Sequence, residues 1–446
     1  MNEIRLALTI TRAECIGCSF IGRLDSITSL RNFHIDDGQY GNDGNTLMKG
    51  RALGVAACLI RWGRDMSFDC SPNVAKSQAD SCNTEPSPIE QSLGLTPTQT
   101  IRLLKQAADL DDPFAMADLG TCFLRGHVLP QNKKNSVILY QKAGDLGSPD
   151  ALFNLALCYE KGDGVPQDKS KAMKLYQQAS DLGDTDAMVT LAVSYLKGDG
   201  VPQDKSKAMK LFQKASDLGD ACAMRILGVY YLKGDGVAQD KSKAIQLFQK
   251  ASDLGDKDAS FNLGICFDKG DGVPQDKSKA IQLFQKAADL GHVEAMFNLA
   301  LFYEKGYGVA QDKDKAIQLY QKAADLGDTD AMNNLARYYK LDDPTAQNNA
   351  KAVQLYQKAT DLGDSLAMFN LGVCLVKGDG VAQDKDKAFQ LFQKASDLGY
   401  TQATFNLAIC YEKGIGTPQD KAKASELYKK ASGRDETHTD HFCTLL

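Results

Sequence analysis

The sequence predicts an all-α protein, a solenoid built from short antiparallel helix pairs. A unit of 36 residues recurs nine times without insertion or deletion, as read from Ala295 in AMFNLALFYEKGYGVAQDKDKAIQLYQKAADLGDTD. Glycine-containing turns divide each unit into two segments whose apolar residues have helical spacing. Repeats of this length are typical of solenoids, in which each unit buries its apolar face against its neighbours. The units begin at Ala115, Ala151, Ala187, Ala223, Ala259, Ala295, Ala331, Ala367 and Ala403.

The first segment of each unit is predicted to be a helix with one apolar face. In the unit from Ala295, that face holds Ala295, Leu299, Ala300 and Tyr303, at i, i+4, i+5 and i+8. The sixth position is always Gly or Ala, which lets a second backbone approach closely. It is occupied by Gly120, Ala156, Ala192, Gly228, Gly264, Ala300, Ala336, Gly372 and Ala408.

The second segment is predicted to be a helix that returns antiparallel to the first. Gly306 is expected to end the first helix in a left-handed cap, and Asp312 to cap the start of the second. The second helix packs through Ala316, Leu319, Tyr320 and Ala323, and Leu326-Gly327 closes the unit.

Four regions follow from this pattern. Residues 97–433 form the solenoid, with a lone second helix at each end, Thr100 to Asp109 and Ala424 to Ser432. Residues 1–70 are an N-terminal segment of unknown fold, weakly ordered or a small cap, and 71–96 are a linker rich in Ser, Pro and Asn. Residues 434–446 are a flexible polar tail.

The composition and charge of the chain argue against several classes of function and location. The net charge is −5, with Lys and Asp interspersed along every unit. A nucleic-acid surface would show a basic stripe, so no nucleic-acid partner is expected. The best apolar run, Ala52 to Ile60, is half of what spanning a bilayer needs, and the N-terminus lacks a secretory signal. A cytoplasmic protein is therefore expected.

The cysteines are expected to be structural. Five of them occupy the eighth position of the first helix, where other copies have Ser, Tyr or Phe, so these thiols should be reduced and buried: Cys122, Cys158, Cys266, Cys374 and Cys410. Cys15 and Cys18 have the spacing of a redox or zinc pair, but no second pair lies nearby. We therefore predict no metal and no cofactor.

No catalytic motif is recognised, and the protein is predicted not to be an enzyme. The recurrent sequence GDGVPQDKS, from Gly162, is similar in composition to a phosphate-binding loop, but such a loop needs Gly directly before its Lys. Asp168 stands there instead, and its carboxylate would repel phosphate. The five histidines do not recur with the repeat, and no Ser/His/Asp set can be argued.

The pattern A-x-x-x-L-[GA]-x-x-Y-x-x-G-x-G-V-x-x-D-x-x-K-A resembles the Sel1-like repeat, a relative of the tetratricopeptide repeat. The resemblance covers about three-quarters of the chain. It implies a right-handed α/α superhelix that serves as an adaptor for other proteins, often at membranes. A secreted subgroup pairs two cysteines within each repeat, and that subgroup is not matched here. The sequence departs from the family pattern in the unit from Ala331, where Leu341 to Pro344 replace the glycine turn.

Positions that vary between copies are the candidate partner-binding surface. In related superhelices the first helix lines the concave face, where aromatic and amide side chains suit an extended peptide. Alternatively, Phe packs between adjacent helices and Asn ties neighbouring repeats together. Arg225, Asn333, Arg337 and Lys340 interrupt the pattern. The candidates are Phe153, Asn154, Phe261, Asn262, Phe297, Asn298, Asn334, Arg337, Phe369, Asn370, Phe405 and Asn406.

The last four residues, Cys443, Thr444, Leu445 and Leu446, resemble a CaaX prenylation box of the geranylgeranyl type. A prenyltransferase and a membrane are therefore expected partners, with Cys443 as the lipidated residue. One lipid gives only reversible binding, and the preceding Asp435, Glu436 and Asp440 offer no basic patch. Stable attachment would then need a protein partner.

These expectations combine into a scaffold held at a cytoplasmic membrane face in a eukaryotic cell. Chitin synthase activators of fungi resemble it in joining such repeats to a CaaX box, and bacterial effectors prenylated by a host are a second setting. The alternatives are a soluble adaptor without a lipid and a β-lactam-binding hydrolase, as reported for some bacterial relatives. No activated Ser supports the hydrolase.

Overall fold

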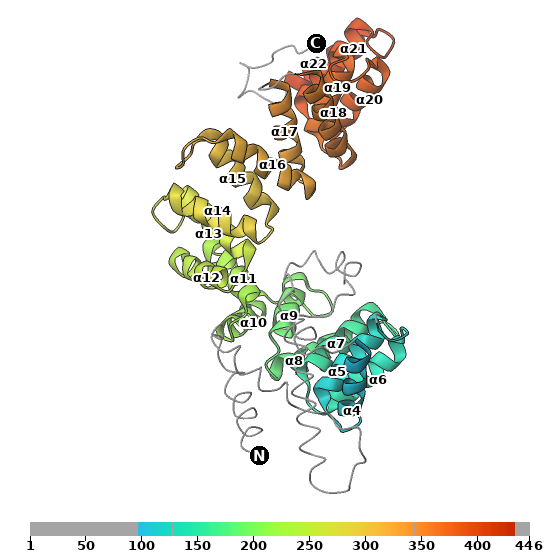
Figure 1. The fold of residues 1–446 in the computed structure, drawn as a ribbon, viewed down its shortest axis with the longest axis vertical. Helices are drawn as coiled ribbons and strands as arrows, with labels where there is room; N and C mark the ends of the chain where they lie inside the picture. The colour runs from blue at the N-terminus through green and yellow to red at the C-terminus, as the bar shows by residue number, and fades with distance from the viewer. Residues whose placement is uncertain (1–96, 127, 342–344, 433–446) are drawn as a thin grey trace. The chain divides into compact units, whose positions relative to one another are not determined.

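The computed structural model describes residues 97–126, 128–341 and 345–432, and these residues form nineteen helices without a strand. As predicted, the helices come in pairs that repeat along the chain as a solenoid (Figure 1). A lone helix, α4 (Pro97–Ala108), precedes them. The first helices are α5 Pro113–Arg125, α7 Pro149–Lys161, α9 Thr185–Lys197, α11 Ala221–Lys233, α13 Lys257–Lys269, α15 Val293–Lys305, α17 Thr329–Leu341, α19 Ser365–Lys377 and α21 Thr401–Lys413. The second helices are α6 Lys133–Asp145, α8 Lys169–Asp181, α10 Lys205–Asp217, α12 Lys241–Asp253, α14 Lys277–Asp289, α16 Lys313–Asp325, α18 Ala346–Asp361, α20 Lys385–Asp397 and α22 Lys421–Ser432.

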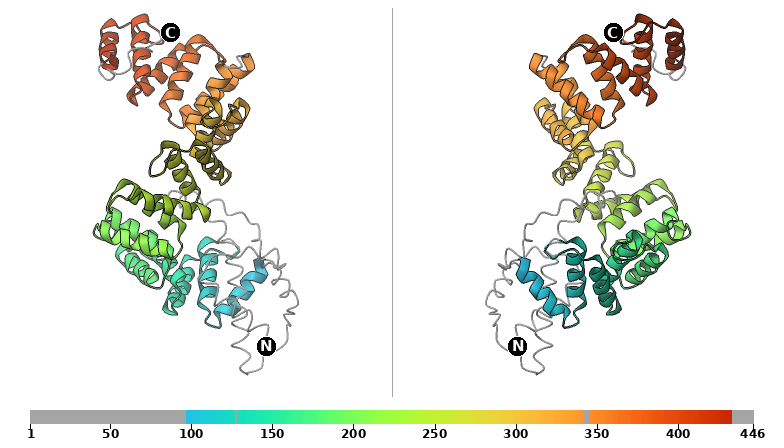
Figure 2. Two further views of the ribbon diagram at one scale, coloured as in Figure 1. Left: turned by 90° about the vertical axis from the view of Figure 1, so that its left-hand side faces the viewer. Right: turned by 90° about the vertical axis from the view of Figure 1, so that its right-hand side faces the viewer.

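The chain divides into two compact units, with the boundary after Leu227, inside α11. In each unit, a helix packs mainly against the helices before and after it in sequence, an order that can be followed in Figure 2. None of the helices in the described part of the chain has the length and apolar content needed to cross a bilayer.

The turns form as the residues predict. Gly306 takes φ 70° and its N–H donates to Phe302 O, which ends α15 in a left-handed cap. Asp312 then caps α16, since its Oδ1 accepts from Lys315 N at 3.0 Å. These caps recur along the array because Gly and Asp recur with them.

Where the sixth position of the first helix is Gly, an aromatic ring from the second helix lies against it. The largest fully buried side chains of the described residues are aromatic residues of the second helices: Tyr140, Tyr176, Phe212, Phe248, Phe284 and Phe392. A Cβ added at Gly264 would lie 2.7 Å from Phe284 Cε1, and one at Gly372 would lie 2.6 Å from Phe392 Cε1. In these repeats the glycine therefore leaves the space that the ring fills, whereas five other copies have Ala at the sixth position.

Two contacts fix the spacing between neighbouring repeats. The second glycine of the turn reaches the start of the preceding second helix, and a Cβ on Gly164 would lie 2.3 Å from Lys133 O. Beside it, Lys133 Nζ contacts Asp163 of the next repeat at 2.7 Å, and Lys169 contacts Asp199 at the same distance.

The repeat from Ala331 differs in its second helix. Thr345 caps α18, which has 16 residues where the others have 12 or 13, so this helix starts one turn early. The position equivalent to the capping Asp312 is Asn348, which is buried inside α18. The loss of the glycine turn thus converts part of the connection into helix.

Candidate protein-binding surface

The predicted phenylalanine column lies on the first helices and packs within each repeat. Phe153, Phe261, Phe297 and Phe405 are half-buried, whereas Phe369 is 7% exposed. Each ring contacts the aromatic ring of the second helix in its own repeat, with centroids 5.1–6.0 Å apart. The rings therefore contribute to repeat packing, and four of them keep an exposed part that a partner can contact.

Two of these rings also contact the cap of the following helix. Phe261 stacks on His292 with centroids 4.4 Å apart, and Phe369 lies 5.4 Å from Tyr400. His292 Nδ1 accepts from Ala295 N at 3.1 Å, in the place that Asp holds in most copies. Burial lowers the pKa of His292, against the opposing effect of Glu294 and Asp258.

Some side chains of the predicted asparagine column are buried or form hydrogen bonds within the array. Asn298 Nδ2 donates to Glu294 O of its own helix at 2.8 Å, and Asn406 is only 4% exposed. Asn154, Asn262, Asn334 and Asn370 are half-buried. At the neighbouring position, Asn333 donates to Asp364 Oδ1 of the next repeat at 2.9 Å. At that site the amide ties two repeats together, as the alternative interpretation expects.

Arg337 of α17 is held by an acid of the preceding repeat. Its Nη2 lies 3.0 Å from Glu304 Oε1, while Tyr320 Oη donates to Glu304 Oε2 at 2.7 Å. Burial by itself would raise the pKa of Glu304, but the hydrogen bonds from Tyr320, Lys305 and Arg337 outweigh it and lower that pKa. A partner's carboxylate that binds Arg337 must therefore compete with Glu304.

Sequence reasoning missed Glu304, although a signal was present. Only three copies have Glu at the tenth position, and each has Tyr in the second helix. The structure joins all three pairs at 2.7–2.8 Å: Glu160 with Tyr176, Glu304 with Tyr320, and Glu412 with Tyr428.

The other interrupting side chains have contacts within the array. Lys340 Nζ lies 2.8 Å from Asp379 Oδ2 and 3.2 Å from Cys374 Sγ, both in the next repeat. Arg225 Nη2 approaches Cys222 Sγ at 3.4 Å. Of the five cysteines predicted to be buried, Cys158, Cys266, Cys374 and Cys410 are buried thiols, but Cys122 is partly exposed.

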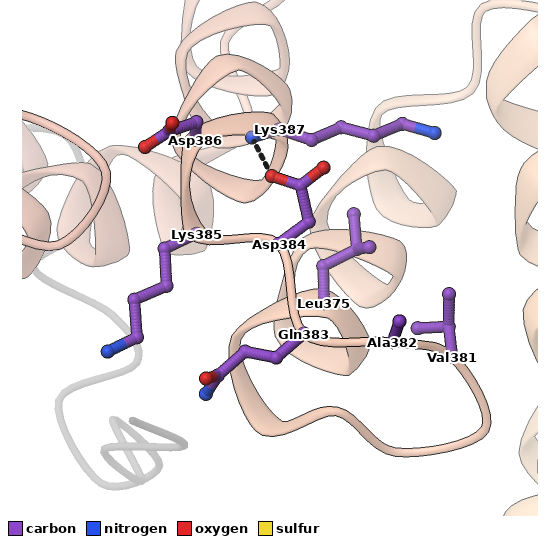
Figure 3. A pocket seen from close by; sticks show the side chains of 8 residues that line it. All are labelled: Leu375, Val381, Ala382, Gln383, Asp384, Lys385, Asp386 and Lys387. Atoms are coloured by element: carbon purple, nitrogen blue, oxygen red, sulfur yellow. Dashed lines mark hydrogen bonds between the residues drawn. The ribbon is translucent and has the colours of Figure 1, made fainter.

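A shallow depression lies where Leu375 replaces the usual aromatic residue of the first helix (Figure 3). In seven other copies, a Lys of the second helix lies over that ring, as Lys171 does over Tyr159 at 4.1 Å from the centroid. Lys387 has no such ring in its own repeat. Asp384, at the edge, accepts from Lys387 N at 2.9 Å and so serves as the cap of α20. The depression thus lies beside the first helix that has Leu in place of this aromatic ring.

No cluster of three metal-ligating side chains occurs among residues 97–126, 128–341 and 345–432. The predicted lipidation site, Cys443, and the motif residues Thr444, Leu445 and Leu446 lie outside the described residues. Cys15 and Cys18 also lie outside them.

Comparison with known proteins identifies the repeat. The family model described as Sel1 repeat matches nine segments: 113–148, 149–184, 185–220, 223–256, 257–292, 293–328, 329–364, 365–400 and 401–435. The structure is similar to that of c5321, a protective antigen of uropathogenic Escherichia coli that displays an SLR fold. The two share 26% identity over 89% of this chain and 88% of that chain, with a TM-score of 0.50. A Sel1 repeat protein from Oxalobacter formigenes is 30% identical over 50% of this chain and 94% of its own, with a TM-score of 0.47. No curated protein matches the chain in sequence.

Proposed function

Because the chain belongs to the Sel1 repeat family, whose members generally act as protein-interaction scaffolds, we propose that it is a non-enzymatic scaffold that binds a protein or peptide along its first helices. This face is expected to be concave, as in related superhelices. The observation that carries the proposal is the column of half-buried rings on these helices, Phe153, Phe261, Phe297 and Phe405. Each ring is fixed by a second ring behind it, so it presents a rigid apolar edge at low entropic cost.

The test compares partners recovered by proximity labelling in cells. Replacing Phe297 and Asn298 with Ala should remove a defined set of partners while the protein stays folded. The control replaces the exposed Gln318 of α16 with Ala and should retain them. An unchanged partner set in a folded double variant rejects the surface. Loss of thermal stability by itself assigns the two residues to repeat packing.

We further propose that the scaffold is held at a cytoplasmic membrane face by a prenyl group on Cys443. The support is the sequence Cys443-Thr444-Leu445-Leu446, in which a terminal Leu favours geranylgeranyl. Intact mass of protein made in a eukaryotic cell should show that lipid, and Cys443→Ser should remove it and release the protein from membranes. Leu446→Ser should shift the lipid towards farnesyl. Identical membrane distributions of wild type and Cys443→Ser favour the soluble adaptor.

A further inference from the structure

Exposed leucines recur at one position in the first eight repeats, from Leu146 to Leu398, whereas the ninth repeat has Arg434 at that position. In the second unit they are Leu254, Leu290, Leu326, Leu362 and Leu398, which we call the leucine row, and 45–60% of each residue is exposed. Each leucine is the residue that follows the last turn of a second helix. Because the repeats stack in sequence order, the row runs along one edge of the unit.

The fold does not require leucine at this position. The helix ends there through backbone groups, as when Leu254 N donates to Lys250 O, and the next residue, Gly255, takes the left-handed conformation at φ 92°. A Cβ on Gly255, Gly291, Gly327 or Gly363 would meet nothing within 4 Å, so this edge is open. Gln or Lys would end the helix equally well. An exposed leucine also loses the free energy that burial of its side chain would contribute. Five such exposures in register form an apolar row that a partner can cover.

The charges beside the row are balanced and held in place. An Asp precedes each leucine and accepts from a Gln one turn earlier, as Asp289 does from Gln285 at 2.8 Å. A Lys lies four residues before each leucine, and Lys286 reaches back to Ser252 O at 2.7 Å, within 3.8 Å of Asp253 Oδ1. The ends of the second helices place equal numbers of Lys and Asp beside the row: Lys250, Lys286, Lys322, Lys358, Lys394 and Asp253, Asp289, Asp325, Asp361, Asp397. Asp256, Asp328 and Asp364, which follow three of the leucines, are engaged as caps of the next helices.

We propose that the leucine row docks against the leucine row of a second copy of this chain, antiparallel, about a two-fold axis at Leu326. Both rows have the same period, so pairing Leu326 with itself also places Leu254 opposite Leu398 and Leu290 opposite Leu362. The balanced charges let the row face itself without repulsion and allow Lys of one copy to meet Asp of the other. An anionic lipid surface is less suited, because a row with as many Asp as Lys gains no net electrostatic attraction from it.

The first experiment measures self-association of the unlipidated full-length chain by sedimentation velocity over a concentration series. The triple variant Leu290→Gln, Leu326→Gln, Leu362→Gln should weaken the dimer by at least about tenfold. Tyr307→Gln is the matched control, since Tyr307 is also 54% exposed but lies in a turn outside the row. Circular dichroism confirms that each variant is folded. A monomeric wild type, or a dimer that the triple variant leaves unchanged, overturns the proposal.

The second experiment tests the register by cysteine cross-linking, with the linked peptides mapped by mass spectrometry to separate them from the native cysteines. Leu326→Cys should cross-link to itself. Leu254→Cys should cross-link only when mixed with Leu398→Cys. Cross-linking of Leu254→Cys to itself, or none at Leu326→Cys, rejects the two-fold axis. A wild type that stays monomeric but binds anionic vesicles through these leucines would instead assign the row to a membrane.

Discussion

The hydroxyl of Tyr320 donates a 2.7 Å hydrogen bond to Glu304, and this pair joins the two helices of one repeat. Glu304 also contacts Arg337 of the next repeat at 3.0 Å. One carboxylate therefore links three helices, α15, α16 and α17. Its side chain is 19% exposed, so water screens these contacts only partly.

Glu304→Gln should destabilise the array by about 1–2 kcal/mol, because it removes the negative charge that accepts hydrogen bonds from Tyr320 and Arg337. In a double-mutant cycle with Arg337→Met, the coupling energy should be about 0.5–1 kcal/mol, since the arginine is half exposed. The measurement is urea denaturation followed by circular dichroism. Glu160 is the matched control: it bonds Tyr176 in the same way, but Val193 stands where Arg337 would be. A zero coupling energy would show that Arg337 is free for a partner.

Gly164→Ala should destabilise the protein much more than Gly183→Ala, although both glycines have positive φ, 76° and 98°. Both substitutions strain the backbone by about 1 kcal/mol. Only Gly164 faces another chain segment, Lys133 O, at a distance that a Cβ cannot occupy. We expect an additional loss of about 1–3 kcal/mol, measured by thermal or urea unfolding. Equal losses for the two variants would mean that the neighbouring repeat yields without cost.

Acidification should destabilise the second unit through His292. Its neutral Nδ1 accepts the capping hydrogen bond, and burial lowers its pKa in the folded protein. The unfolded chain therefore binds a proton more readily, near its ordinary pKa of about 6.5, and stability falls as the pH drops below that value.

His292→Asp restores the capping residue of most copies and should remove this component of the pH dependence above about pH 5, where Asp stays ionised. The measurement is the unfolding temperature between about pH 7.5 and 5.5. Identical pH profiles for the wild type and the variant would contradict the assignment to His292.

The buried thiols should resist alkylation in the folded protein. Burial raises the pKa of Cys158, Cys266 and Cys410 to about 11, so little reactive thiolate forms at pH 8. Peptide mapping after brief maleimide treatment should find Cys122 labelled before these three, because it is partly exposed, and the three only after unfolding. Rapid labelling of Cys266 in the native state would indicate local opening of α13.

The repeat, its caps and its buried faces were predictable because they depend on residues close together in the sequence. Gly306 and Asp312 lie at the ends of the helices that they cap, and the helical period defines the apolar face. The link between Lys133 and Asp163 was not predicted, since it depends on how one repeat lies on the next. The early start of α18 was also missed, because Thr345 competes as a cap only once the glycine turn is lost.

The contact between Lys133 and Asp163 is repeated 36 residues later by Lys169 and Asp199, and within the second unit by Lys241 and Asp271. Successive repeats are thus joined by the same Lys–Asp contact, so the contact surface at the end of one repeat also fits other copies of the repeat. Removing or duplicating one whole repeat inside a unit therefore leaves compatible ends. A recombination event that adds or removes one repeat therefore needs no new interface, so the number of repeats can change in evolution in single steps.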